Sequence, residues 1–130
     1  MKTIANTIAS KIITNNNFRK KQIKLHFSNS FVTIPVDKII RLEGACNYTV
    51  VHTQNKKYVS ARTLKHFQGI LDESCFVRVH KSHIVNIRHV KGLDIQSKSS
   101  AVAFDEGENI EVSRRKLKEV AQKFQAYKKS

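Results

Sequence analysis

The sequence predicts a mostly β fold with two short-to-medium helices. Short runs rich in β-branched and aromatic residues, each bounded by turn-forming residues, recur between residues 24 and 112. Two other stretches place apolar residues at helical spacing, one in the middle of the chain and one near its end. A chain of 130 residues is long enough for one domain with its own hydrophobic core and too short for two ordinary domains.

The first block of predicted strands occupies residues 24–60. Residue types that favour turns separate its runs, which predicts hairpin or meander connections. The expected strands are Lys24–Phe27, Phe31–Pro35, Lys38–Leu42, Tyr48–Thr53 and Lys57–Ser60, with turns at 28–30, 43–45 and 54–56.

Two helices and a second block of strands follow. Apolar residues share one face of a helix predicted at Thr63–Leu71. The same spacing returns over Arg114–Tyr127, and Ser113 is the predicted N-cap of that helix. Between the helices, strands are expected at Phe76–Val79, Ile84–Ile87, Val90–Gln96, Ala101–Phe104 and Ile110–Val112.

Residues 1–23 are predicted to be a basic N-terminal arm or linker in front of a domain at residues 24–130. The arm carries five Lys or Arg residues and no acid. Isoleucines recur at helical spacing over residues 3–13, but a helix with so little to pack against is expected to fray. The segment is either a solvated tail or an arm that follows phosphates or enters a minor groove.

The charge balance indicates a polyanionic partner. Lys and Arg number 24 against 10 Asp and Glu, which gives a formal net charge of +14. Nucleic acid is the first candidate. A membrane surface would need about 20 consecutive apolar residues or a basic amphipathic helix with aromatic anchors. The sequence shows neither of these and no secretory signal, so we expect a cytoplasmic protein without a membrane partner.

Two cysteines, Cys46 and Cys75, are too few for a disulfide framework and are not spaced as a zinc site. We interpret both as free thiols. No metal and no cofactor is expected.

Cations gather at the start of the last predicted helix. Arg114, Arg115 and Lys116 follow the predicted cap directly, where the helix dipole is already positive. Each such placement is unfavourable by roughly 0.3–1 kcal/mol unless an anion is present. A bound phosphate would use the exposed amides and the cationic side chains together. The alternative is chance on a surface already rich in cations.

A polar quartet, residues 80–83, interrupts an apolar run. Strand alternation directs Val77 and Val79 to the core and Phe76, Arg78 and His80 away from it. The quartet is predicted to be a tight loop whose side chains donate to phosphate or to base edges, with Lys81 suited to guanine. Its two histidines, His80 and His83, lack the further ligands of a zinc site. A nuclease with a histidine pair is an alternative, but we expect no enzyme.

The predicted loop at residues 43–48 is the weakest of the three candidates. Asn47 could pair with adenine and Tyr48 could donate to phosphate. Asn47 could equally stabilise its own turn.

Three blocks, taken together and in order, resemble the LytTR family of bacterial DNA-binding domains. They are Ile39–Glu43 with Asn47 and Tyr48, the run Phe76–Asn86, and the run Val112–Leu117. The resemblance covers about residues 24–127.

The resemblance implies a β fold that inserts loops into successive major grooves of double-stranded DNA and bends it. It implies base or groove contacts from Asn47 or Tyr48, from Lys81 and from Arg115. His80, Ser82, Ser113 and Arg114 would contact the DNA backbone. Two copies on paired half-sites are a further implication.

Two departures from the family pattern matter. Members commonly carry an N-terminal receiver domain, for which these 130 residues have no room. The chain is therefore expected to be a stand-alone member or a piece of a longer protein, with an unknown upstream signalling partner. His83 stands where the family often has an aromatic residue, so it could pack, contact phosphate or make binding depend on pH.

The sequence thus favours a sequence-specific transcription regulator. The alternative is a protein that binds RNA or any nucleic acid through charge alone. Single-strand stacking would need exposed aromatic residues on a sheet, and only 8% of the residues are aromatic.

Overall fold

Antiparallel hairpins build most of the molecule. The computed structural model describes residues 21–26, 29–96, 98–104 and 107–129. Most of the predicted basic arm, residues 1–20, lies outside this range. The strands are β1 (Gln22–His26), β2 (Phe31–Pro35), β3 (Ile39–Ala45), β4 (Tyr48–Thr53), β5 (Lys57–Ser60), β6 (Phe76–His80), β7 (His83–Asn86), β8 (Val90–Ile95), β9 (Ser100–Phe104) and β10 (Asn109–Glu111). The helices are α2 (Leu64–Ile70) and α3 (Leu117–Lys129), and short 3-10 turns occur at η1 (Val36–Lys38), η2 (Ile87–His89) and η3 (Arg114–Lys116).

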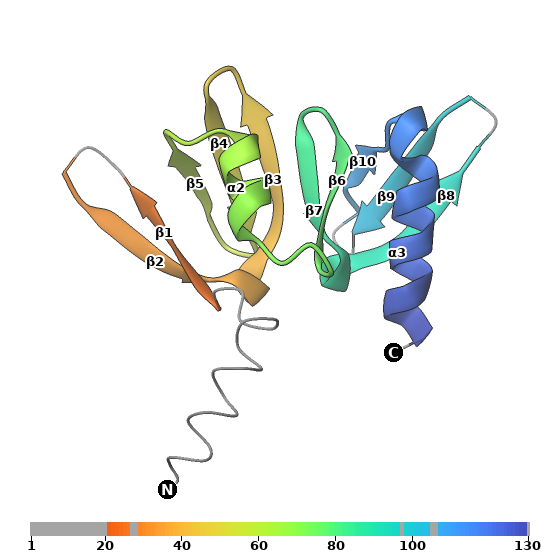
Figure 1. Ribbon diagram of the computed structural model, residues 1–130, viewed down its shortest axis with the longest axis horizontal. Coiled ribbons are helices and arrows are strands. Elements are labelled where there is room, and N and C mark those ends of the chain that lie inside the picture. Colours follow the sequence, from red (N-terminus) through yellow and green to blue (C-terminus); the bar gives the residue numbers. More distant parts are fainter. Residues whose placement is uncertain (1–20, 27–28, 97, 105–106, 130) are drawn as a thin grey trace, which may run out of the picture.

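The strands form three antiparallel sheets within the described residues. A central sheet has the order β5-β4-β3-β7-β6, flanked by the β1–β2 hairpin and by a sheet of order β10-β9-β8. Figure 1 shows the hairpin on one side of the central sheet and the three-stranded sheet with α3 on the other. The mostly β prediction with two α-helices is confirmed for the described part of the chain.

Hydrophobic cores lie on both sides of the central sheet. One core joins the β1–β2 hairpin and α2 to the sheet, and it contains Leu25, Leu42 and Phe67. The other joins the sheet to β8–β10 and α3, and it contains Val79, Phe104 and Val120. Both faces of the sheet are therefore covered, which fixes the relative positions of the three sheets.

Phe76 corrects one prediction of strand alternation. It was expected to point away from the core, but it is only 7% exposed and belongs to the core beneath α2. Val77 and Val79 do lie in a core, the second one. Alternation identified the two faces of β6 correctly, but it could not show that the chain covers both of them.

The connection between β3 and β4 is shorter than predicted. Glu43, Gly44 and Ala45 continue β3 and pair with β4, and only residues 46 and 47 form the turn. Gly44 serves packing instead of a turn, because a Cβ atom there would lie 2.9 Å from the Leu64 Cδ1 atom of α2. Cys46 takes the positive φ of 56° that the tight turn requires.

Smaller differences lie at other element boundaries. β1 begins at Gln22, two residues before the predicted start of the domain. The first turn of the last predicted helix is the 3-10 turn η3, and the α-helix begins at Leu117.

Candidate nucleic-acid interface

Three segments that are distant in sequence meet at one edge of the molecule, which we name the turn edge. It comprises the β3–β4 turn at residues 46–47, the β6–β7 turn at residues 81–82, and η3. β3 and β7 pair so that Glu43 lies opposite His83, which places both turns at the same end of the central sheet. Figure 1 shows both turns and the start of α3 along the upper edge.

Two backbone hydrogen bonds fix these segments to one another. The Gly44 N–H donates to the Ser82 carbonyl at 2.8 Å, which ties β3 to the β6–β7 turn. The Ser113 N–H donates to the Val79 carbonyl at 2.8 Å, which ties the start of η3 to β6. The spacing of the three segments is therefore set by the scaffold.

A hollow of about 340 Å³ lies at this edge between α2, the β6–β7 turn and η3. Four of its lining residues are cations and none is acidic, so the hollow is suited to an anion. We call it the cationic hollow. Its lining residues are Gln68, Arg78, His80, Lys81, Ser113, Arg115 and Lys116.

The β6–β7 turn carries the exposed side chain of Lys81, and hydrogen bonds hold the backbone of this turn. The Ser82 N–H donates to Nδ1 of His80 at 3.1 Å. His80 must then carry any ring proton of its neutral form on Nε2, which is a donor suited to a phosphate oxygen. One histidine thus holds the turn and still offers a donor.

η3 carries the cations that the sequence placed in the first turn of a helix. Arg114 and Arg115 are exposed, whereas Lys116 lies 3.7 Å from the Glu119 carboxylate. Ser113 is the N-cap residue of η3, as predicted by its position, but its side chain makes no capping hydrogen bond. The cations therefore precede the α-helix, so side chains and not helical amides dominate the charge at this point.

The predicted site residues all lie on the three segments of the turn edge or directly next to them in the chain. Four of them line the cationic hollow, and the others lie on the turns or beside them. They are Asn47 and Tyr48 at the β3–β4 turn, His80, Lys81 and Ser82 at the β6–β7 turn, and Ser113, Arg114 and Arg115 at η3. Asn47 and Tyr48 are exposed. Their contacts with DNA stay a prediction.

A network of charged side chains around the buried Arg41 was missed by the sequence analysis. Arg41 is 6% exposed, and its guanidinium contacts Glu108 through Nε at 3.1 Å and through Nη2 at 2.6 Å. Its Nη1 atom lies 3.4 Å from Glu43, whose Oε1 is 3.0 Å from Nε2 of His52. The only sequence signal was a charged residue inside the apolar run Ile39–Leu42.

Charge and burial shift the pKa values of this network. The hydrogen bond from Arg41 holds the pKa of Glu108 below its usual range. Burial acts to raise the pKa of Glu43, but the bond from His52 and the charge of Arg41 outweigh it and the pKa is lowered. Burial lowers the pKa of His52 despite its bond to Glu43, so this histidine is neutral near neutral pH and donates a hydrogen bond.

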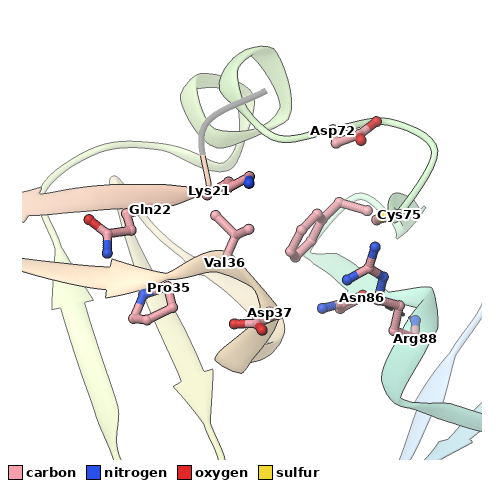
Figure 2. Close-up of a pocket in the computed structure, with 10 residues that line it drawn as sticks. Lys21, Gln22, Pro35, Val36, Asp37, Asp72, Cys75, Asn86 and Arg88 are labelled. Carbon is pink, nitrogen blue, oxygen red and sulfur yellow. Dashed lines mark hydrogen bonds between the residues drawn. The ribbon is translucent and has the colours of Figure 1, made fainter. Parts of the chain in front are cut away.

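A second hollow, of about 410 Å³, lies at the opposite end of the central sheet (Figure 2). It surrounds the start of β1, the η1 turn and the end of β7, the ends of the strands farthest from the turn edge. Its lining mixes the cations Lys21 and Arg88 with the acids Asp37 and Asp72. This mixture gives no preference for a polyanion.

Most of the chain matches the model of one protein family. The model of the LytTr DNA-binding domain matches residues 29–125. The chain belongs to the LytTR family. It is therefore a DNA-binding domain of the kind found in bacterial transcriptional regulators, and the family is not catalytic.

Relatives of this LytTR domain include much longer proteins. The heme-containing CO-sensing transcriptional regulators RcoM 1 and RcoM 2 of Paraburkholderia xenovorans (strain LB400) are each 29% identical over 91 residues, which is 70% of this chain and 34% of theirs. The transcriptional regulatory protein LytR of Staphylococcus aureus (strain N315) is 37% identical over 43 residues, 33% of this chain and 18% of LytR. The match thus spans about a third of the length of the RcoM regulators and a smaller share of LytR.

A solved structure supports the fold. The LytTr DNA-binding domain of a putative methyl-accepting/DNA response regulator from Bacillus cereus superposes with a TM-score of 0.71 at 24% identity. The match covers 80% of this chain and 96% of that one.

Three further features concern metal ligands, membrane spans and the cysteines of the described residues. Among them, no three His, Cys, Asp or Glu side chains are grouped to hold a metal ion. In the same part of the chain, no helix has the length and apolar character needed to cross a bilayer. Cys46 and Cys75 are free thiols.

The buried position of His83 leads to a prediction of how the stability of this LytTR domain depends on pH. Its Nδ1 atom is buried without a hydrogen-bond partner among the described residues. Burial first, and the nearby charge of Arg41 second, lower its pKa from 6.5. The unfolded chain therefore binds a proton at His83 that the folded chain refuses, and stability falls as the pH drops below 6.5.

We expect His83→Phe to raise stability more at about pH 5 than at about pH 8, because it removes a group that must stay neutral. Urea unfolding at both pH values measures this. At about pH 8, where the histidine is neutral in both states, only the packing difference and the loss of the unpaired nitrogen should remain. His52 keeps part of the pH dependence. An equal change at both pH values would show that His83 is not the group responsible.

Proposed function

We propose that this LytTR domain binds double-stranded DNA in a sequence-specific manner as part of a bacterial transcription regulator, with its turns in successive major grooves. One observation carries the proposal: a hollow lined by four cations and no acid lies between α2, the β6–β7 turn and η3 at one edge of the molecule. Phosphates bind such a hollow without regard to sequence. The turns beside it bring side chains to base edges.

Each site residue receives a role from its position. Lys81, at the tip of a two-residue turn, donates to guanine O6 and N7, and Arg115 offers a bidentate donor of the same kind. Asn47 pairs with adenine. Phosphate contacts come from Nε2 of His80 and from the side chains of Tyr48, Ser82, Ser113 and Arg114.

The proposal also places the protein in the cell and on its target. Chromosomal DNA lies in the bacterial cytoplasm, so a regulator of this kind acts there. Two copies occupy paired half-sites, since a single domain with a short edge covers few base pairs. An upstream domain or partner supplies the signal, as the greater length of the RcoM and LytR relatives suggests.

Binding of single-stranded RNA through base stacking is the second candidate, and the surface argues against it. Stacking needs aromatic side chains gathered on one platform. The exposed aromatic residues of the described chain are Phe31, Tyr48 and Tyr127, which lie on β2, β4 and α3. They do not share a sheet face, so charge alone would have to hold RNA.

Selection from a random pool of duplex DNA tests the proposal. We expect an enriched motif that occurs twice, with half-sites separated by about 10–10.5 base pairs or a multiple of that spacing. Affinity for the enriched duplex should fall steeply with salt, by about 0.9 in log affinity for each phosphate neutralised. Structured RNA serves as competitor. An unenriched pool together with equal competition by RNA would support the charge-driven alternative and overturn the proposal.

A further inference from the structure

Arg78 lies beside the site, and the DNA contacts assigned above leave it without a role. It is half-buried on β6 and lines the cationic hollow. Its Nε donates to the His80 carbonyl at 3.3 Å, and its Nη2 donates to the Lys81 carbonyl. Its Nη1 donates to Oε1 of Gln68 on α2 at 3.0 Å. One guanidinium therefore joins two carbonyls of the β6–β7 turn to a helix.

The peptide group between Lys81 and Ser82 is held at both of its ends. Its carbonyl accepts from Arg78, and its N–H donates to Nδ1 of His80 at 3.1 Å. The next carbonyl, of Ser82, accepts from the Gly44 N–H. A two-residue turn would otherwise exchange these bonds with water and sample several conformations.

From this geometry we infer that Arg78 is a positioning residue for the recognition of bases by Lys81. Arg78 fixes the backbone of the β6–β7 turn, so that the Lys81 side chain leaves the turn in one direction. The inference rests on the proposed function. Because the turn is already ordered in the folded protein, DNA binding does not have to offset the loss of conformational entropy that ordering the turn would cost. Gln68 anchors the guanidinium to α2.

The planar guanidinium is essential to this role. Its donors are arranged in a fixed fork and reach three acceptors at once. A lysine would keep the positive charge in the hollow, but its single ammonium group cannot hold the same three acceptors in one plane. Arg78→Lys therefore separates the geometric role from the electrostatic one.

The test compares Arg78→Lys with the wild type on the enriched duplex and on a scrambled duplex. We expect Arg78→Lys to lower discrimination between the two duplexes by about tenfold. This factor corresponds to the entropy lost when the backbone of one residue has to be ordered on binding. The salt dependence should stay unchanged because the charge is retained. Amide hydrogen exchange of Ser82 should become faster.

Two further variants complete the design. Gln68→Ala removes only the anchor on α2, and it should change discrimination and Ser82 exchange in the same direction by a smaller factor. Arg88→Lys is the matched control, because this exposed arginine lines the hollow at the opposite end of the sheet (Figure 2). It should leave discrimination and Ser82 exchange unchanged.

The outcomes separate the two proposals. If the wild type itself shows no discrimination, the proposed function fails. If the wild type discriminates and Arg78→Lys matches it in discrimination and in Ser82 exchange, the function stands and the positioning role of Arg78 is wrong. An equal loss of affinity for both duplexes, with Ser82 exchange unchanged, would make Arg78 a phosphate contact and would also overturn its positioning role.

Discussion

Replacing Lys81 or Arg115 by Ala is expected to weaken binding to the enriched duplex by about 1–3 kcal/mol, which is about 5- to 150-fold. Both side chains line the cationic hollow, one from the β6–β7 turn and one from η3. Each substitution should weaken binding to the enriched duplex more than binding to the scrambled duplex, because a base contact distinguishes sequences and a phosphate contact does not. Fluorescence anisotropy with enriched and scrambled duplexes at fixed salt measures both quantities.

The control for these variants removes the same charge from the other end of the sheet. Lys56 is exposed in the β4–β5 connection, at the end of β4 opposite the β3–β4 turn. Lys56→Ala should leave discrimination unchanged and lower affinity only slightly, through the loss of one distant charge. If Lys81→Ala and Arg115→Ala keep full discrimination, the proposed base contacts are wrong.

Much of the fold could be predicted because it follows from local patterns. Strands of four to six residues with turn residues between them, such as Tyr48–Thr53 and Lys57–Ser60, were predicted with the observed bounds. Thr63 was expected to begin a short helix, and its side chain does accept from the His66 N–H ahead of α2. Local hydrogen bonding and side-chain alternation decide such elements without help from the rest of the chain.

The misplaced boundaries depend on contacts that are distant in sequence. Gly44 suggested a turn, but it lies within β3, where the close approach of the Leu64 side chain from α2 favours a residue without a Cβ atom. Ser113 does stand at the N-cap position, but the helical segment that follows begins as a 3-10 turn, the Ser113 N–H donates to the Val79 carbonyl and its side chain makes no capping hydrogen bond. In both places tertiary packing overrode a sound local preference.

The candidate site divides in the same way. Its exposed cations could be found from charge and strand alternation, since Lys81 and Arg115 stand in polar stretches. The groups that hold them could not, because the pairing of Arg78 with Gln68 spans ten positions and that of Arg41 with Glu108 spans 67. Long-range partners leave no periodic signal in a single sequence.

Removal of the Glu108 carboxylate is expected to destabilise the fold by about 2 kcal/mol near pH 7. Arg41 is 6% exposed and would keep only the Glu43 contact at 3.4 Å. Loss of one partner of a fully buried pair costs about 3–5 kcal/mol, and the smaller value follows because the Glu108 side chain is 41% exposed. Urea unfolding of Glu108→Ala and wild type measures the difference. Glu111→Ala, an exposed carboxylate on the neighbouring strand, is the control and should change stability by less than about 0.5 kcal/mol.

The sign of the pH dependence makes this prediction sharper. The pKa of Glu108 is lowered from 4.5 by Arg41, so its contribution is complete above pH 4.5 and is lost as the pH falls through the folded-state value. The difference between Glu108→Ala and wild type should therefore shrink in acid. A difference that persists in acid, or one no larger than that of Glu111→Ala, would contradict the role given to the ion pair.

The same ion pair joins two chain segments that lead to the turn edge. Arg41 lies on β3, which ends at the β3–β4 turn, and Glu108 directly precedes β10, which leads to η3. The bond between them thus joins the strand that leads to the β3–β4 turn to the chain segment that leads through β10 to η3. Arg41→Met combined with Glu108→Ala should recover much of the lost stability, since an apolar side chain needs no partner in the core. Full discrimination of DNA by this double variant would show that packing alone can hold these two segments in place, whereas reduced discrimination in a stable double variant would assign that task to the charges.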